Sequence, residues 1–399
     1  YEVEATGLQL YPRYYCRFIC GEDTSQLGRT RTAPDDATTP GELNFGVTSC
    51  SSTYSGYFNA FRQMARRPEL DLIIHLGDFL YEFVDEDEEV RVPTPYPERP
   101  TDEASYRSFM RYLLLDPDLR LARQMKPFTH LWDNHDVFEP VDTLDQAMTW
   151  WRNYTPTRLP QGRTAAEIYR SLEYGTMVDV THIDMLTKRD GDNILGQAQF
   201  TWLEDELTNS DATWHLLANQ KMFANFDVSI PGFPEVSDWS SYPASRQRLM
   251  QHLVDEQIDN VMMLSGDSHF TVLADNPLAL SSYDASTGDG SVMTEFLPTS
   301  ISRGNLDEMG FDGLAETAVG IVQGQNPNHV IDEFVQHGYG TLTITPDSIL
   351  AQVYYCPILE VTDQQYVGAR ATVHAGANHY DRSSVATPTG VTVGRTQVA

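Results

Sequence analysis

The chain has 399 residues, 41% of them hydrophobic, with 6 Trp, 20 Tyr and 17 Phe. This apolar content can offset the entropy of ordering the chain, which excludes wholesale disorder, and no run reaches the about 18 consecutive apolar residues of a membrane-spanning helix. The formal net charge is −30, and Lys126, Lys188 and Lys221 are the only lysines. We therefore expect a soluble protein with an acidic surface suited to salty or extracellular water, and no standing DNA or RNA partner, because the basic patches that such a partner requires are missing.

The first 35 residues are expected to form two short strands, in YEVEATGL and RYYCRFI, and a linker that contains TRTAPDD. Two strands alone are marginally stable, so they must pack against another part of the protein. The chain opens at Tyr1 with neither Met nor an apolar signal segment, and we expect a processed or excised N-terminus.

Cysteine pairing leaves the redox compartment open. In an extended strand Cys16 and Cys20 lie about 13 Å apart, which is too far for a bond between them, and Cys356 is an alternative partner for either.

After the linker, apolar strands alternate with amphipathic helices, which is the pattern of an α/β domain. Expected strands cover 43–50, 71–78, 128–133, 177–186, 213–220 and 260–269, and helical patterns cover 56–67, 101–127, 141–154 and 195–210. A late β-hairpin over 341–355 turns at Pro346 and Asp347, and a tail of mobile composition follows it.

Functional groups of open α/β sheets collect just beyond the carboxyl ends of the strands. Four of the apolar runs end in residues that can bind a metal: Cys50; Asp78 and Tyr81; Asn134 with its neighbours Asp133, His135 and Asp136; and Asp267 and His269. A single Gly-Asp after a strand is most often a turn, but four such endings in sequence favour a metal site.

The spacing of Asp78 and Tyr81 lets a carboxylate and a phenol from one turn reach the same cation. A phenolate is a hard ligand suited to Fe3+, and Cys50 adds a thiolate if the metal keeps it deprotonated. Asp78 can also bridge to a second ion, for which Asn134 and Asp267 offer oxygen ligands suited to Ca2+ or another divalent metal. Paired metals clamp the attacking and leaving oxygens of a phosphoryl displacement and generate hydroxide at neutral pH.

Other polar residues near these strand ends have candidate roles. His135 is placed to donate a proton to the leaving oxygen, with Asp136 or a backbone group fixing its tautomer. Arg158 is a candidate for binding phosphate oxygens, and Asn219 and Gln220 either supply an amide or make ordinary hydrogen bonds at a strand end. The histidines inside β-runs, namely His75, His182 and His215, are expected to be structural.

Several motifs occur together along the chain: FGVTSC, DLIIHLGDFLYE, LWDNHD, a Tyr-x-Pro-x-Arg run ending at Arg158, LGQAQFTWLEDEL, ATWHLLANQ, LSGDSH, DGSVMTEFLPTSIS and HGYGTLTITPDSILAQVYY. In this order they resemble the PhoD-type alkaline phosphatases, a group of metallophosphoesterases related to the purple acid phosphatases. The resemblance implies an α/β fold with a two-layer β-sandwich core flanked by helices (αββα). It also implies Fe3+ with Ca2+ in the site, and hydrolysis of phosphate monoesters or diesters by a secreted or periplasmic protein.

Carried over by motif, Cys50, Asp78, Tyr81 and His269 would hold iron, and Asp78, Asn134 and Asp267 would hold calcium. The family usually has Trp-Asp-Asp-His-Glu where this chain has WDNHD, which leaves the identity of the second metal open. By the same resemblance, residues 1–35 are the terminal strands of an N-terminal β-sandwich domain, and residues 36–399 are the metallophosphatase domain with its C-terminal hairpin and tail.

Three alternatives compete with a phosphatase. One is a phosphodiesterase of phospholipase D type on the same scaffold, and another is a non-catalytic binding sandwich. A serine hydrolase is the third, but it needs a Gly-x-Ser-x-Gly elbow and the sequence has none. Metal analysis separates the metal-dependent enzymes from the binding module.

Overall fold

The computed structural model describes residues 5–84, 90–91, 99–138, 144–160, 162–164, 166–228, 239–306, 308 and 315–387. Part of the predicted C-terminal tail, residues 388–399, lies outside the described residues.

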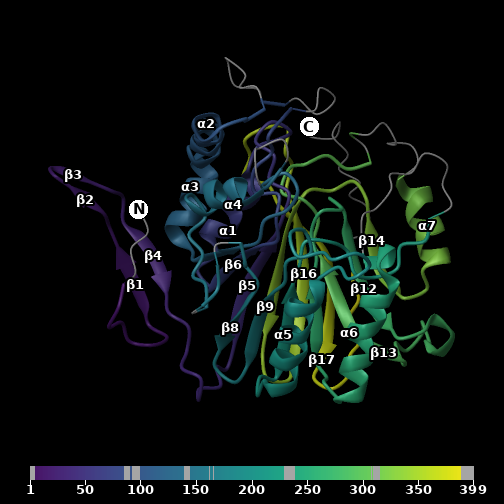
Figure 1. Ribbon diagram of the computed structural model, residues 1–399. Coiled ribbons are helices and arrows are strands. Elements are labelled where there is room, and N and C mark those ends of the chain that lie inside the picture. The colour runs from purple at the N-terminus through teal and green to yellow at the C-terminus, as the bar shows by residue number, and fades with distance from the viewer. Residues whose placement is uncertain are drawn as a thin grey trace.

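The N-terminal segment is a long hairpin that projects from the body of the protein (Figure 1). Its strands β1 (Arg13–Cys16) and β4 (Gly28–Arg31) pair antiparallel, and β2 (Ile19–Cys20) pairs with β3 (Asp23–Thr24) beyond them. The linker was expected to include residues 30 and 31. That expectation was wrong, because both residues belong to β4, which pairs with β1. The first strand was expected over residues 1–8, of which residues 1–4 lie outside the described residues, and no strand forms over residues 5–8.

All four cysteines lie in the described part of the chain and are free. Cys16 and Cys20 are exposed on the hairpin, whereas Cys50 and Cys356 are buried in the body. The alternative pairing with Cys356 is therefore not formed.

Two mixed sheets make up the body. The six-stranded sheet has the order β17-β16-β15-β5-β6-β7, and the seven-stranded sheet has the order β14-β12-β13-β11-β10-β9-β8. The first sheet comprises β5 (Leu43–Thr48), β6 (Leu72–His75), β7 (Phe128–His130), β15 (Gly338–Ile344), β16 (Ser348–Tyr355) and β17 (Tyr366–His374). The second comprises β8 (Arg170–Tyr174), β9 (Val178–His182), β10 (Trp214–Ala218), β11 (Val261–Leu264), β12 (Thr271–Pro277), β13 (Ser291–Leu297) and β14 (His329–Glu333).

Alternation of side chains along the strands explains why the two sheets pack face to face. Phe45 of β5 shares one buried cluster with Leu216 of β10 and Leu264 of β11. Their neighbours Leu217 and Met263 point to the opposite face and belong to a second cluster. Because successive residues of a strand alternate between faces, β10 and β11 are buried on both sides.

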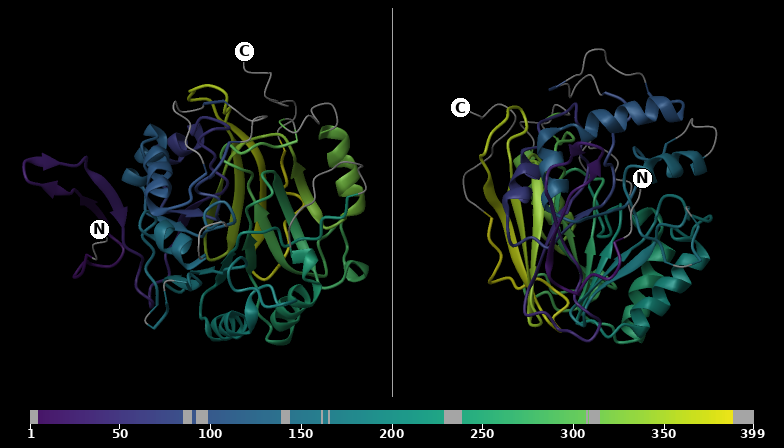
Figure 2. Two further views of the ribbon diagram at one scale, coloured as in Figure 1. Left: turned by 45° about the horizontal axis from the view of Figure 1, so that its top comes forward. Right: turned by 90° about the vertical axis from the view of Figure 1, so that its left-hand side faces the viewer.

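Helices cover the outer faces of the sandwich. The second cluster joins the seven-stranded sheet to α5 (Gly196–Asn209) and α6 (Pro243–Asp255), and it contains the predicted apolar face of α5, Phe200, Leu203 and Leu207. In the right-hand view of Figure 2, these teal helices lie on the side opposite to the yellow strands of the six-stranded sheet. The remaining helices are α1 (Asn59–Arg66), α2 (Glu103–Leu114), α3 (Pro117–Met125), α4 (Leu144–Arg152) and α7 (Ala315–Gln325).

Local sequence signals set where several helices begin. Asp102 caps α2 by accepting from the Ser105 backbone amide at 2.8 Å, and Asp116 caps α3, whose first residue is Pro117. None of the helices in the described ranges is long and apolar enough to cross a membrane.

The fold confirms the expected α/β class with two packed sheets and flanking helices. The division into an N-terminal remnant and a catalytic domain stays a prediction.

Candidate metal centre

The candidate site lies at the carboxyl ends of strands from both sheets. In the six-stranded sheet, β5, β6 and β7 run parallel, and the segments after them carry Cys50, Asp78 with Tyr81, and Asn134 with its neighbours. In the seven-stranded sheet, β10 and β11 run parallel, and Asp267 and His269 follow β11. The shared strand direction is what brings these segments to one edge.

Four of the predicted residues adopt a left-handed backbone conformation. The φ angles are 55° for Cys50, 55° for Asp78, 64° for Asp267 and 62° for His269. Such conformations cost roughly 1–3 kcal/mol each for non-glycine residues and persist where the surroundings impose them. Here the Cys50 amide donates to the carbonyl of Gly77 at 3.1 Å, which fixes the first two loops against each other.

Gly77 permits the close approach of a third loop. Its φ is 120°, and a Cβ atom at this position would lie 2.8 Å from the Cβ of Asp133. Any other residue would push Asp78 and Asp133 apart.

Cys50, Asp78, Tyr81 and His269 converge into one buried cluster. The Tyr81 hydroxyl lies 3.1 Å from Asp78 Oδ2 and 3.3 Å from His269 Nε2, and Cys50 Sγ lies 3.7 Å from Asp78 Oδ2. One ligand atom each from Cys50, Asp78 and His269 lies within 4.8 Å of the others. A thiol, a carboxylate, a phenol and an imidazole therefore share one small volume, which is a donor set that fits a transition metal.

Burial and negative charge hold two of these groups in their protonated form. Burial raises the pKa of the Cys50 thiol well above its usual value, and Asp78 raises it further. The same two causes raise the pKa of the Tyr81 phenol. A bound cation would reverse this balance, because metal ligation favours the thiolate and the phenolate.

His269 is already in the form that a metal requires. Burial, followed by the charge of Arg303, lowers its pKa to about 3, so the imidazole is neutral. Its Nδ1 donates to the carbonyl of Gly304 at 2.9 Å, which leaves the Nε2 lone pair toward Tyr81 and the cluster.

A second cluster contains Asp78, Asp133 and Asp267, whose carboxylate oxygens also approach within 4.8 Å of one another. Lys221 lies among them. Its Nζ is 2.9 Å from Asp133 Oδ2 and 3.1 Å from Asn134 Oδ1, and it donates to Asp267 Oδ1. Burial alone would lower the pKa of Lys221, but Asp133, Asp267 and Asp78 outweigh it and raise the pKa, so the side chain carries a positive charge.

His135 stands beside the first cluster. Its ring stacks on Tyr81 with the centroids 4.3 Å apart, and its Nδ1 donates to Glu82 Oε2 at 2.8 Å. Burial opposes protonation of His135, but Asp78 and Glu82 outweigh it and raise the pKa to about 9. The sequence suggested Asp136 or a backbone group as the partner of this ring, and the Asp136 suggestion was wrong. Both oxygens of Asp136 accept from backbone amides, among them Leu80 at 2.9 Å.

Asn219 and Gln220 make hydrogen bonds that join the strand ends. The Gln220 side chain donates to the carbonyl of Trp132 at 2.9 Å and accepts from the Met185 amide at 3.1 Å. Asn219 donates to the carbonyl of Leu264 at 3.0 Å and accepts from the Lys221 amide at 3.1 Å. Of the two roles considered, these contacts match the structural one.

The exposed side chain of Arg158 lies in the segment that follows α4. Its role at a substrate phosphate stays a prediction.

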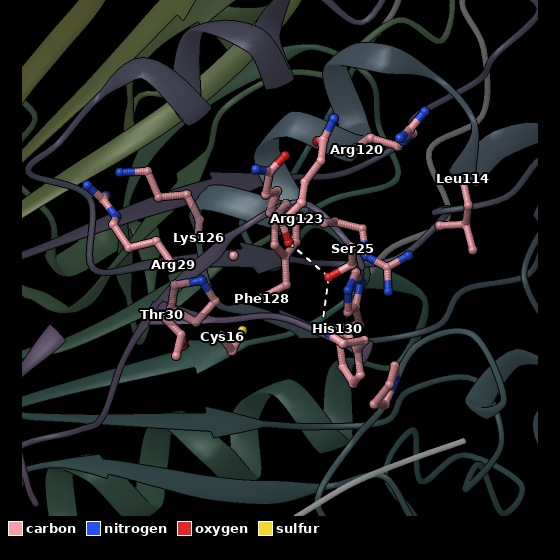
Figure 3. Close-up of a pocket in the computed structure, with 16 residues that line it drawn as sticks. Cys16, Ser25, Arg29, Thr30, Leu114, Arg120, Arg123, Lys126, Phe128 and His130 are labelled. Atoms are coloured by element: carbon pink, nitrogen blue, oxygen red, sulfur yellow. Dashed lines mark hydrogen bonds between the residues drawn. The ribbon is translucent and has the colours of Figure 1, made fainter. Parts of the chain in front are cut away.

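An open cavity of about 640 Å³ lies elsewhere, between the N-terminal hairpin and α3 (Figure 3). Its lining includes Cys16, Arg29, Arg123, Lys126 and His130. None of the predicted site residues lines it, so this cavity is distinct from the candidate metal centre.

A family model described as "PhoD-like phosphatase" matches residues 45–353, which cover every residue of both clusters. The chain belongs to the PhoD-like phosphatase family.

Two relatives show how far the likeness extends. "Alkaline phosphatase D" of Bacillus subtilis (strain 168) is 28% identical over 398 residues, an alignment that covers 90% of this chain and 66% of that protein. The present chain thus spans just under two thirds of that relative. A solved structure described as "Structure of PhoD" is 25% identical and superposes with a TM-score of 0.84, covering 98% of this chain and 80% of its own.

Within this PhoD-like chain, sequence reasoning missed two side chains. Glu82 contacts His135, and Lys221 joins Asp133 to Asn134 and Asp267. Each has a signal in the sequence, since Glu82 ends the DLIIHLGDFLYE motif and Lys221 is one of only three lysines. Asp133, which the sequence indicated as a metal-competent neighbour of Asn134, lies in the second cluster.

Proposed function

We propose that this protein is a metal-dependent hydrolase of phosphoric esters, an alkaline phosphatase that acts on monoesters and accepts diesters. The observation that carries the proposal is the convergence of Cys50, Asp78, Tyr81 and His269 from separate loops into one buried donor set. The family of the chain and the name of its Bacillus subtilis relative support the same reaction class.

We further propose that Cys50, Asp78, Tyr81 and His269 hold Fe3+, because a phenol and a carboxylate are hard donors that suit this ion. Bound there, the ion would polarise a phosphoryl oxygen and lower the pKa of water. The calcium expected on Asp78, Asn134 and Asp267 competes with Lys221 for two of those three residues.

The residues of the chain account for the proton that hydrolysis requires. As the bond from phosphorus to the leaving alcohol breaks, its electron pair moves to the leaving oxygen, which takes a proton from His135 Nε2. Glu82 holds Nδ1 of that ring at 2.8 Å, so Nε2 is the nitrogen left for this transfer. The oxygen of water forms the new bond to phosphorus, and the proton that this water loses passes to the solvent, from which His135 is protonated again. Arg158 is proposed to bind the remaining phosphate oxygens.

We also propose that the protein acts outside the cytoplasm, in a secreted or periplasmic form. Its net charge of −30 with only three lysines supports this proposal, since such a surface suits extracellular water.

Elemental analysis of the purified protein, together with a panel of aryl phosphate monoesters and diesters, tests the function. We expect bound iron, hydrolysis of esters, and a visible charge-transfer band that Cys50→Ala and Tyr81→Phe shift or abolish. The matched controls are Cys356→Ala and Tyr380→Phe, because both residues are buried away from the cluster and should leave the band unchanged. A protein that binds no transition metal and hydrolyses no ester would be a binding module instead.

A further inference from the structure

Lys221 occupies the place where the second cation was expected. Two of the three predicted calcium ligands, Asn134 and Asp267, bind its ammonium group directly, and Asp133 binds it from a third side. The third predicted ligand, Asp78, has carboxylate oxygens within 4.8 Å of those of Asp133 and Asp267. The ammonium group therefore lies inside the oxygen set that would surround a divalent ion.

Three side-chain oxygens hold the ammonium group. It donates hydrogen bonds to Asn134 and Asp267, and it forms an ion pair with Asp133 Oδ2 at 2.9 Å. The Lys221 side chain is only 14% exposed, so little water reaches the ammonium group to compete with these oxygens. Lys221 thus makes the contacts of a bound cation and not those of a surface residue.

The fold fixes the lysine at this point. Asn219 accepts from the Lys221 amide at 3.1 Å, and the carbonyl of Gln220 accepts from the Gly266 amide at 3.0 Å. Since Asp267 follows Gly266 directly, these two bonds hold the backbone of Lys221 beside the loop that carries its carboxylate partner.

From these contacts we infer that the Lys221 ammonium replaces the second metal ion, so that the protein works with one metal and a built-in organic cation. The inference rests on the proposed function for the first metal site. The inference deepens that function because it changes the positive charge beside the phosphoryl group. A lysine contributes one positive charge, whereas a divalent ion contributes two. Held by these three side chains, the Lys221 ammonium neutralises the carboxylates around it.

The number of ions bound by the unaltered protein is the first test. We expect about one transition-metal ion per chain by elemental analysis, and no saturable binding of Ca2+ alone below about 1 mM in calorimetric titration. A second equivalent of metal in the unaltered protein, held with micromolar affinity, would overturn the inference.

The second test removes the ammonium and keeps the length of the side chain. In Lys221→Met, we expect the oxygens of Asp78, Asp133, Asn134 and Asp267 to take up one equivalent of Ca2+, at least about tenfold more tightly than the unaltered protein. Added Ca2+ should also raise the melting temperature of this variant alone. The matched control is Lys188→Met, which changes a lysine outside both clusters and should bind Ca2+ as the unaltered protein does.

A double variant, Lys221→Met with Asp133→Asn, covers the case in which the single variant does not fold, because it removes one positive and one negative charge together. If a folded Lys221→Met or double variant binds Ca2+ no better than the unaltered protein, the inference is wrong. Failure of the proposed function has a different signature, namely absence of iron and of ester hydrolysis, and does not change the Ca2+ comparison.

Discussion

The Glu82 carboxylate sets the orientation of the His135 ring. One of its oxygens accepts from His135 Nδ1 at 2.8 Å, and the other accepts from the Arg99 guanidinium at 2.7 Å. Tyr81 stacks against the same ring, so the imidazole is held on one edge and on one face. An imidazole fixed in this way presents a single nitrogen for proton transfer.

We predict that His135→Ala lowers kcat by about 10²–10⁴-fold while the iron content stays near that of the unaltered protein, because the loss is one of proton donation. Glu82→Gln should lower kcat less, since it weakens the orientation of the ring but keeps the ring itself. The control is His374→Ala, on the exposed end of β17. Steady-state kinetics and elemental analysis on the same samples check this, and if His135→Ala loses iron in proportion to activity, His135 is a ligand.

Strand β10 connects the site to the interior of the seven-stranded sheet. It ends at Ala218, beyond which Asn219 and Gln220 hold the neighbouring strand ends and Lys221 reaches the carboxylates. Within the strand, His215 is only 6% exposed, and burial lowers its pKa to about 4. The histidines predicted to be structural, His75, His182 and His215, all lie buried inside strands.

The pKa of His215 predicts a loss of stability in acid. Above about pH 6.5, the imidazole is neutral in both the folded and the unfolded protein, so it adds no pH dependence. Between about pH 6.5 and 4, the unfolded chain takes up a proton that the folded protein does not, which lowers the free energy of unfolding by up to about 3 kcal/mol. In His215→Gln, the fall in unfolding free energy over this range, measured by urea titration at a series of pH values, should shrink by about that amount. His374→Gln, at an exposed position, should leave the fall unchanged, and an equal fall in both variants would contradict the assignment.

The strands around the site could be predicted because each is a short apolar run followed directly by polar residues, as in β5, β6 and β11. The parallel direction of such strands then brings their ends together, which is why the sequence could predict that Cys50, Asp78, Tyr81 and His269 lie close to one another. Strand β12 escaped prediction because it contains the polar Asp275 and Asn276, both fully buried. Arg382, from the far end of the chain, pairs with Asp275 at 2.7 Å, and such a distant partner leaves no local pattern.

The residues missed at the site also have partners that are distant in the sequence. Glu82 and His135 are 53 residues apart in the chain, and Lys221 and Asp267 are 46 apart. A lysine is also not a metal ligand by its ordinary chemistry at neutral pH, so a search for ligand types passes over Lys221. Only the packed structure shows that it lies between the carboxylates.

The molecule as a whole carries a formal net charge of −30. Self-repulsion among so many carboxylates disfavours the compact state, and salt screens it over a Debye length of about 10 Å at 0.1 M. Repulsion between carboxylates therefore lowers the stability of the folded protein by an amount that depends on the salt concentration.

We predict that the melting temperature rises as NaCl increases from about 0.05 to 0.5 M, because screening reduces the repulsion. Differential scanning calorimetry at fixed pH measures the change. KCl at the same ionic strength is the control, since it screens charge equally. A melting temperature that is independent of salt, or that falls, would show that surface repulsion does not limit stability.

The donors of the candidate metal centre are far apart in the polypeptide, since His269 follows Tyr81 by 188 residues and is made after Cys50, Asp78 and Tyr81. A nascent chain cannot assemble this donor set until β11 has emerged from the ribosome and paired with β10. Capture of the ion is therefore a late event in biogenesis. The compartment in which folding finishes, and not the one in which translation starts, decides which metals compete for the protein.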